Sequence, residues 1–381
     1  MLRCQKHLFS LSDEVTYLNC ATMSPFLQSV ETIGIENLKR KSNPQHIKSH
    51  DFFTDRQLLK ERFAQLIHAP HPDCVSIIPS VSYGIGTVIK NIPFERGDEI
   101  VMLEDQFPSN VYGWMELEKT HGVKLITVSA PPLTPGRGSL WNKRLMDAIN
   151  ERTKVVAIPQ VHWSDGTLFN LKAVRNKTLA MEAYLIIDGT QSIGAMPFSI
   201  EEIRPDALIC GGYKWLMGAY GLGMAYFGER FYKGSPLEDN WINHQGSEDF
   251  TNLAKYNPSF KPKASRYDMG ESSNFILVPM LAQAIRQIST WTTEAIQQYC
   301  KEITAEPIKT LEGSGYFVEA PEYRGHHLFG IYASGKKPME AIKKALTESN
   351  IQVSYRGEAI RVSPHLYNTR EDLEKLVNCF I

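Results

Sequence analysis

Short apolar runs alternate with helical patterns from Cys74 onward. The apolar runs are rich in Val and Ile, and between them apolar residues recur at three- and four-residue spacing. This alternation is typical of β/α layering. The predicted strands lie near residues 74–79, 98–104, 123–129, 154–160, 184–188, 206–210 and 222–228. The predicted helices between them lie near residues 82–91, 111–121, 140–152 and 171–183.

The predicted strands are apolar on both faces, without the alternation of a half-exposed strand. Such strands belong to parallel sheets that helices cover on each side. The pattern therefore predicts an α/β fold with a mostly parallel sheet sandwiched by helices.

The pattern changes near Tyr232. Residues 233–274 form a long segment rich in Gly, Pro, Ser and Asn, which in a compact enzyme is usually functional or faces another subunit. A helical pattern then runs from about Phe275 to Ile308, and a smaller α/β unit follows. We predict a large domain over residues 15–270, and a small domain of residues 271–381 joined by residues 1–14.

Composition and charge exclude several classes of function. The 381 residues include 41 basic and 42 acidic side chains, for a net charge of −1, so no charged field favours nucleic acid or an anionic membrane. No apolar run approaches the length of a bilayer span, and the N-terminus lacks the apolar core of a signal peptide. These observations predict a cytoplasmic protein that binds neither nucleic acid nor membrane.

Cysteine and histidine spacing offers no metal site. The six cysteines lie far apart, without a C-x-x-C pair, and read as reduced thiols. His46 and His50 have helical spacing, but the Glu of an H-E-x-x-H zinc site is missing. We predict no metal.

Chemically active residues follow five of the predicted strands. Ligands of open α/β sheets bind outside the carboxyl ends of the strands, so these residues are candidates for one site. They are Ser80 and Ser82, then Glu104, Asp105 and Phe107, then His162, Trp163 and Ser164, then Asp188 and Gln191, and finally Tyr213 and Lys214. Simpler roles stay open, since the serines suit a helix cap as well as a phosphate cradle and Phe107 suits a core.

Lys214 lies between Tyr213 and Trp215, with glycines on both sides, at the end of a predicted buried strand. It is either a surface lysine with a buried stem or a lysine kept for covalent chemistry. Asp188 follows four apolar residues and needs a cation, either Lys214 or a cationic ligand. Pyridoxal 5′-phosphate combines a phosphate, a flat ring, a ring nitrogen and an aldehyde, and it would use all these groups.

The pattern D-x-x-Q from Asp188 to Gln191, with an aromatic-Lys-Trp sequence 23 residues after the glutamine, resembles the class V aminotransferases. This family belongs to the fold-type I pyridoxal-phosphate enzymes, with the cysteine desulfurases, kynureninases and isopenicillin-N-epimerase-like proteins. The resemblance extends from Tyr17 to the C-terminus. It implies a fold-type I transferase architecture and a homodimer with shared active sites.

The resemblance also implies roles for individual residues. Lys214 would be the Schiff-base lysine, Asp188 the partner of the pyridine nitrogen, Gln191 a neighbour of the phenolic oxygen, and Phe107 the stacking ring. The other implied cofactor contacts are Ser82, Tyr83, Ser164, Tyr213 and, across the dimer, Ser272, with Glu271 and Ser273 as alternatives.

On the substrate side, the resemblance implies contacts from Asn19 and Trp163 and a carboxylate clamp at Arg361. A planar guanidinium suits that task because it binds a carboxylate through two parallel hydrogen bonds.

One departure from the family narrows the reaction. Desulfurases carry a nucleophilic cysteine shortly before the carboxylate-binding arginine, but no cysteine lies between Cys300 and Cys379. The resemblance therefore implies an aminotransferase-type enzyme that acts on the amine of an amino acid or related small molecule, with Lys214 also serving as base. A lyase acting by C–S cleavage or β-elimination, or an epimerase, is the alternative. An NAD-dependent oxidoreductase using Tyr83–Gly86 and a non-catalytic binding protein are the other classes considered.

Overall fold

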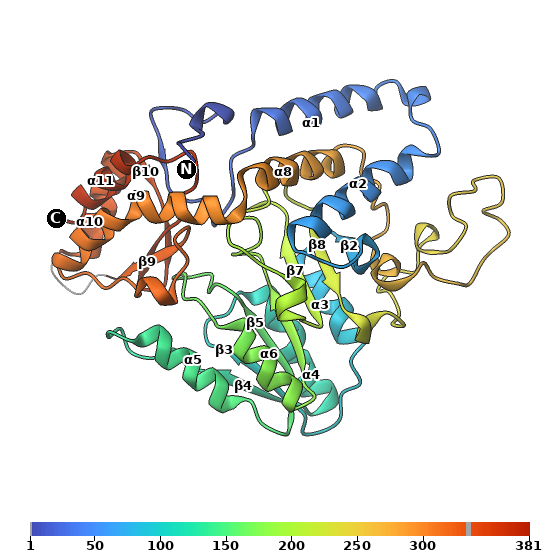
Figure 1. The fold of residues 1–381 in the computed structure, drawn as a ribbon, viewed down its shortest axis with the longest axis horizontal. Helices are drawn as coiled ribbons and strands as arrows, with labels where there is room; N and C mark the ends of the chain where they lie inside the picture. Colours follow the sequence, from blue (N-terminus) through green and yellow to red (C-terminus); the bar gives the residue numbers. More distant parts are fainter. Residues whose placement is uncertain (1, 333–336) are drawn as a thin grey trace.

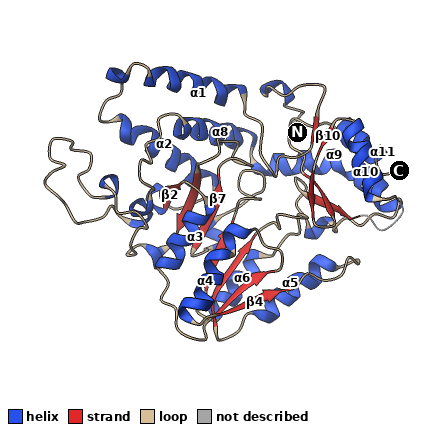
Figure 2. Ribbon diagram, turned by 180° about the vertical axis from the view of Figure 1, so that it is seen from behind, coloured by secondary structure: helices blue, strands red, loops and turns tan. Residues whose placement is uncertain are grey.

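The computed structural model describes residues 2–332 and 337–381, and its centre is a seven-stranded sheet (Figures 1 and 2). The strand order is β2-β8-β7-β6-β5-β3-β4. The strands are β2 (Val75–Ile78), β3 (Glu99–Leu103), β4 (Lys124–Val128), β5 (Thr153–Pro159), β6 (Tyr184–Asp188), β7 (Ala207–Gly211) and β8 (Gly223–Phe227). Only β8 runs antiparallel to its neighbours, so the expected mostly parallel α/β sheet is confirmed.

Both faces of this sheet are buried, except at the edge strand β4. Alternate residues of a strand point to opposite faces, and in β6 Leu185 and Ile187 join one core while Tyr184 and Ile186 join the other. The first face is covered mainly by α2 (Asp51–Leu66), α5 (Arg137–Ala148), α6 (Leu171–Ala180), α7 (Ile200–Ile203) and α8 (Leu277–Trp291). The second is covered by α3 (Val81–Lys90), α4 (Tyr112–His121) and the short helix η7 (Lys263–Tyr267).

A smaller assembly lies beside the sheet and contains both chain termini (Figure 1). Its antiparallel sheet has the order β11-β12-β9, and a separate parallel pair joins β1 to β10. The strands are β1 (Thr16–Tyr17), β9 (Phe329–Tyr332), β10 (Ile351–Gln352), β11 (Ser354–Arg356) and β12 (Ala359–Val362). The helices are α9 (Thr293–Gly313), α10 (Met339–Glu348) and α11 (Arg370–Asn378).

The division into domains at residue 270 stays a prediction. Helix α8 contributes residues both to the core under the large sheet and to the core of the smaller assembly. Strand β1, which the sequence assigned to the large domain, pairs with β10 of the smaller assembly. Helix α1 (Gln28–Lys41) packs along α8.

The helix expected from Phe275 to Ile308 is two helices in the structure, α8 and α9. Thr292 separates them with a φ of 67°, which a β-branched residue rarely adopts and which ends α8. The Thr292 hydroxyl then caps α9 by accepting a hydrogen bond from the backbone N–H of Ala295. The apolar spacing continues across this break, so the pattern alone did not reveal it.

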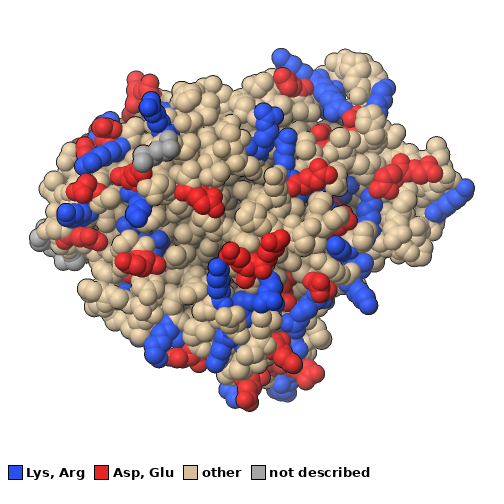
Figure 3. Space-filling view, in the orientation of Figure 1, with Lys and Arg blue, Asp and Glu red and all other residues tan. Residues whose placement is uncertain are grey.

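The outer surface carries acidic and basic side chains interspersed on the face shown in Figure 3. Among the described residues, no helix is long and apolar enough to cross a membrane. Because the charges on this face are mixed, surface charge does not mark a functional region. The cavities of the molecule are the better candidates.

Helix α8 supports the loop that follows β7. Leu281 is fully buried and packs closely against this loop. A Cβ atom added at Gly218 would lie only 2.6 Å from the Leu281 Cδ1 atom. The loop is closed by a hydrogen bond of 2.8 Å from the Gly218 N–H to the Gly212 carbonyl. Gly218 is thus required for the close approach of α8 to this loop.

We predict that Leu281→Ala lowers the free energy of unfolding by about 2 to 5 kcal/mol, since it removes buried methyl groups and leaves a cavity. Leu179→Ala, on α6 where Leu179 is 45% exposed, is the control and should change it by no more than about 0.5 kcal/mol. Urea denaturation of both variants measures this difference. Equal effects would show that Leu281 does not support the core.

Candidate active site

A cavity of about 160 Å³ opens at the carboxyl ends of β5, β6 and β7, against the start of α3. It contains both the lysine and the aspartate singled out in the sequence, Lys214 and Asp188. Its lining residues include Ser80, Gln106, Phe107, Ser109, Trp163, Asp188, Thr190, Gln191, Tyr213, Lys214 and Tyr220.

Lys214 lies in the loop between β7 and β8 and is 5% exposed. Its Nζ lies 5.2 Å from the centre of the Phe107 ring and 5.5 Å from that of Tyr213. Within the described residues, this ammonium forms no hydrogen bond or ion pair. The pKa of Lys214 is lowered to about 8, chiefly by burial and also by the nearby Arg361 charge, while Asp188 partly offsets both effects.

Asp188 ends β6 and is 6% exposed. Its carboxylate accepts a hydrogen bond of 3.0 Å from the Thr190 backbone N–H. Burial raises the pKa of Asp188. The Thr190 hydrogen bonds and the Lys214 charge act in the opposite direction, but their effects are smaller. A buried carboxylate of this kind is stabilised by a cation, and no ion pair to Asp188 occurs in the described part of the chain.

Gln191 is held in one orientation by two buried groups. The Trp215 indole N–H, which only donates, bonds the Gln191 Oε1 at 2.8 Å. The Gln191 Nε2 donates to the Ala21 carbonyl at 3.1 Å. Because Nε2 carries two hydrogens, its second N–H is left for a ligand oxygen in the cavity that Gln191 lines.

Aromatic rings form the walls of the cavity. Phe107 and Trp163 meet edge to face at 5.4 Å, and Tyr213 and Tyr220 do so at 4.6 Å. The Trp163 indole N–H donates to the Asp105 carbonyl, and Asp105 has a φ of 52°, which Asp tolerates better than most residues. This anchors Trp163 to the turn that carries Phe107.

The start of α3 faces the cavity. Ser80 is the N-cap of this ten-residue helix and accepts a hydrogen bond from the Tyr83 backbone N–H at 3.2 Å. The Ser80 and Ser82 hydroxyls lie 2.9 Å apart. The serines can therefore serve as a helix cap and as a phosphate cradle, because Ser80 caps a helix whose positive N-terminal end is also suited to an anion.

Arg361, in β12, is 1% exposed and is held by neutral acceptors only. Its guanidinium donates to the Trp163 carbonyl at 2.8 Å, to the Thr22 hydroxyl at 2.6 Å and to the Ser354 hydroxyl at 3.3 Å. Its Nε has no partner, and no carboxylate in the described residues pairs with it. Burial lowers the pKa of Arg361 to about 9.

The remaining candidates do not line this cavity. Asn19 accepts hydrogen bonds from Thr22 and Ser354, two of the groups that hold Arg361. Ser164 bonds His162 at 2.8 Å. Ser272 is fully buried and its hydroxyl has no partner within the described chain, whereas Glu271 beside it is exposed.

Four polar or aromatic lining residues were not singled out in the sequence: Gln106, Ser109, Thr190 and Tyr220. Ser80 could be singled out because it directly precedes the helical pattern. Thr22 and Ser354 lie far apart in sequence, and no local pattern indicates that they meet at Arg361. The residues that the structure describes contain no cluster of three or more potential metal ligands.

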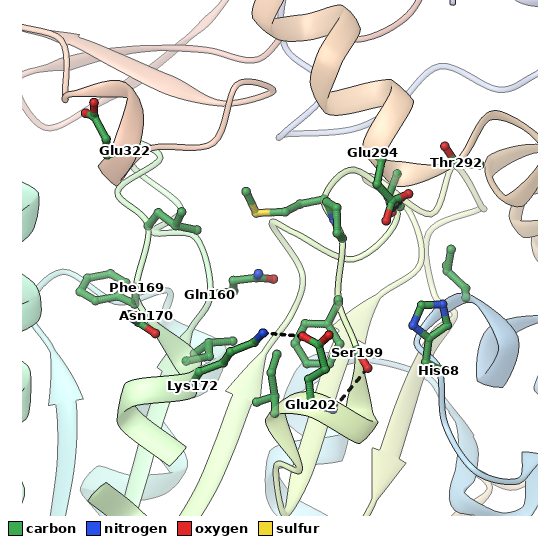
Figure 4. Close-up of a pocket in the computed structure, with 18 of the residues that line it drawn as sticks. His68, Gln160, Phe169, Asn170, Lys172, Ser199, Glu202, Thr292, Glu294 and Glu322 are labelled. Carbon is green, nitrogen blue, oxygen red and sulfur yellow. Dashed lines mark hydrogen bonds and ion pairs between the residues drawn. The ribbon is translucent and has the colours of Figure 1, made fainter. Parts of the chain in front are cut away.

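A larger cleft of about 970 Å³ shares no lining residue with this cavity (Figure 4). Glu294 and Glu322 lie along one side, and a Lys172–Glu202 ion pair of 2.6 Å lies opposite. Since its lysine is already paired and surface exposed, the cleft offers no reactive group comparable to Lys214. The smaller cavity is therefore the better candidate for the active site, because it contains the more reactive lysine.

The model of the aminotransferase class-V family matches residues 16–376. The chain belongs to this family. The enzyme is 24% identical to the uncharacterized aminotransferase YcbU of Bacillus subtilis, over 84% of its own length and 82% of that protein. It is 25% identical to a probable cysteine desulfurase of Staphylococcus aureus, over 92% and 82% of the two chains.

Solved structures share the fold. The cysteine desulfurase of Thermococcus onnurineus NA1 superposes with a TM-score of 0.82 at 18% identity, covering 100% of the enzyme and 98% of that chain. A mutant of C-DES with glycine covalently linked to its pyridoxal-phosphate cofactor superposes with a TM-score of 0.85 at 16% identity, covering 98% of each chain. The expected fold-type I architecture is confirmed.

Family membership also confirms two further expectations, that the protein is an enzyme and that its cofactor is pyridoxal 5′-phosphate. It does not decide between the reactions, because relatives are named both aminotransferase and cysteine desulfurase.

We predict that Lys214 in the cofactor-free enzyme loses its proton as the pH rises through about 8, well below the ordinary lysine value of 10.5. The midpoint should fall in Asp188→Asn, because a group that raises the pKa is removed, and should rise in Arg361→Gln. Competitive acetylation over a pH series, read by mass spectrometry of the Lys214 peptide, measures it. A midpoint near 10.5 would contradict the burial described here.

Proposed function

We propose that the enzyme is an aminotransferase-type enzyme that acts on the amine of an amino acid or a related amino compound. The observation that carries this proposal is the buried, unpaired ammonium of Lys214 in a cavity that also contains the buried carboxylate of Asp188. A lysine of lowered pKa is more nucleophilic at neutral pH, which suits covalent attachment of an aldehyde cofactor.

The residues of the cavity fit pyridoxal phosphate. Asp188 needs a cation that the described chain does not supply, and the protonated ring nitrogen of the cofactor is such a cation. The start of α3, with the Ser80 and Ser82 hydroxyls and with Tyr83 next to them, suits the phosphate. Phe107 suits stacking on the ring, and the second N–H of Gln191 suits its phenolic oxygen. Tyr213 and Ser164 complete the proposed cofactor contacts.

When bound, the cofactor withdraws electrons from the bonds at the carbon that carries the substrate amine. The chain must then remove a proton from that carbon. Lys214 is the base that we propose, since its pKa of about 8 lies near the working pH and its Nζ lies inside the cavity.

Arg361 is the proposed binding group for the substrate carboxylate. Its guanidinium is oriented by Trp163, Thr22 and Ser354, yet carries no negative partner. A buried charge of this kind is favourable only when a counterion arrives. Asn19 contributes indirectly, because it accepts hydrogen bonds from the Thr22 and Ser354 hydroxyls. The ring of Trp163 lines the cavity and would limit the space open to the substrate.

A lyase or epimerase of the same family is the alternative, because the first steps are common to all three reactions. Desulfurization through a cysteine nucleophile is disfavoured. Cys20, which lies close enough to influence Lys214, is fully buried, and burial raises its thiol pKa to about 12. At neutral pH it is a thiol rather than a reactive thiolate.

We also propose a homodimer with shared active sites. Large apolar side chains are exposed on α1 and on the irregular segment before α8, among them Ile35, Leu38, Trp241, Phe250 and Tyr256. A second copy of the chain would cover such surface. In this arrangement Ser272, or its neighbours Glu271 and Ser273, would contact the partner's phosphate. A cytoplasmic location is consistent with six unpaired cysteines.

The reaction is tested by incubating the cofactor-loaded enzyme with amino acids and a keto acid acceptor. We expect a new keto acid and a new amino acid in equal amounts, with the activity abolished in Lys214→Ala because the base is lost. Ammonia with a keto acid but no acceptor use would indicate a lyase, and stereoinversion alone an epimerase. Either outcome would overturn the aminotransferase assignment.

A further inference from the structure

A second arginine, Arg356, lies on the same face of the small sheet as Arg361. Ser354 pairs with Arg361 and Arg356 pairs with Ala359 across the antiparallel strands β11 and β12. Cross-strand partners share a face, and so do residues two apart on one strand. Arg356 and Arg361 are therefore diagonal neighbours on one face of this hairpin.

Both guanidiniums converge on one ring of the cavity wall. The Arg356 Cζ atom lies 5.4 Å and the Arg361 Cζ atom 5.9 Å from the centre of the Trp163 ring. Trp163 lines the cavity and packs against Phe107, whose ring centre also lies 5.2 Å from the Lys214 Nζ. The two arginines thus lie on the side of the site that Trp163 bounds.

Neither arginine has a negative partner. No carboxylate of the described residues lies within ion-pair distance of Arg356, and its one hydrogen bond goes to the backbone carbonyl of Tyr355 at 2.8 Å. Its Nε is buried and unpartnered, as is the Nε of Arg361. The positive charges of both residues contribute to the lowered pKa of Lys214. Three cations therefore surround a site in which Asp188 is the one buried carboxylate of the cavity lining.

We infer that the substrate is an amino compound with two acidic groups, one bound by Arg361 and the other by Arg356. One carboxylate on Arg361 leaves the second guanidinium without a counterion beside a largely apolar wall. A second acidic group, a carboxylate or a phosphate, supplies it with charge-assisted hydrogen bonds. This inference rests on the proposed function, because it names the substrate class of the same site.

Arg361 and Arg356 differ in burial and in hydrogen bonding, and this difference matches the two roles proposed for them. Arg361 is buried and fixed by three neutral acceptors, as suits a group common to all amino acid substrates. Arg356 is half-buried at the end of β11, next to the Gly357 turn, where a side chain of variable length can reach it. The second arginine therefore determines specificity, while the first determines orientation.

The test is a spectroscopic titration of the cofactor-loaded enzyme with matched pairs: aspartate and asparagine, glutamate and glutamine, phosphoserine and serine. The change in cofactor absorbance gives a dissociation constant for each compound. We expect the acidic member of at least one pair to bind about 10 to 100 times more tightly than its neutral counterpart. The pair with the largest ratio distinguishes a carboxylate from a phosphate.

Variants assign the preference to one residue. Arg356→Gln should bring the acidic and neutral members within about threefold of each other, with the affinity for the neutral member unchanged. Arg356→Lys should keep part of the preference, because it keeps the charge. Arg361→Gln should weaken both members alike. Arg370→Gln, which removes an exposed ion pair to Glu374, is the matched control and should keep the wild-type preference.

Two results would overturn the inference while leaving the proposed function intact. One is equal binding of acidic and neutral members by the wild-type enzyme. The other is an Arg356→Gln variant that weakens both members equally, which would indicate a structural role. If no amino compound alters the cofactor spectrum, the proposed function fails and the inference fails with it.

Discussion

The burial of the Lys214 ammonium is the constraint on which the site depends. An ammonium at this depth is destabilised by the loss of water, and its pKa falls to about 8. Asp188 is close enough to raise that pKa in part, but it is too far away to form an ion pair with the lysine in the described structure. Each group is therefore left in need of a partner, and in the proposed function pyridoxal phosphate would provide one for both through its aldehyde and its ring nitrogen.

Burying the charged groups of Lys214 and Asp188 destabilises the fold, and the packing around them holds them in position. Leu281 of α8 presses on the glycines of the lysine-bearing loop, while Trp215 next to the lysine orients Gln191. Asp188 ends β6, and Lys214 lies in the loop that follows the neighbouring strand β7. The small sheet carries Arg361 and Arg356, so the proposed substrate site involves both assemblies of the chain.

Much of this could be predicted from the sequence, because the information was local. Buried runs of Val and Ile identified all seven strands of the large sheet, and the residues that follow those strands include Lys214, Asp188, Gln191 and Phe107. The break at Thr292 was missed because apolar spacing continues through it. The hydroxyls of Thr22 and Ser354 were missed because they meet Arg361 only through long-range folding. Arg356 was missed for a similar reason, since its importance follows from strand register and from the lack of an acidic partner.

The central claim is that Lys214 holds the cofactor covalently, and mapping the site of attachment tests it most directly. The enzyme is loaded with pyridoxal phosphate, reduced with borohydride, digested and analysed by mass spectrometry, with Lys214→Ala treated in parallel. The account predicts a stable pyridoxyl adduct on the peptide containing Lys214 and none in the variant. An adduct on another lysine, or an equal yield in Lys214→Ala, would contradict it.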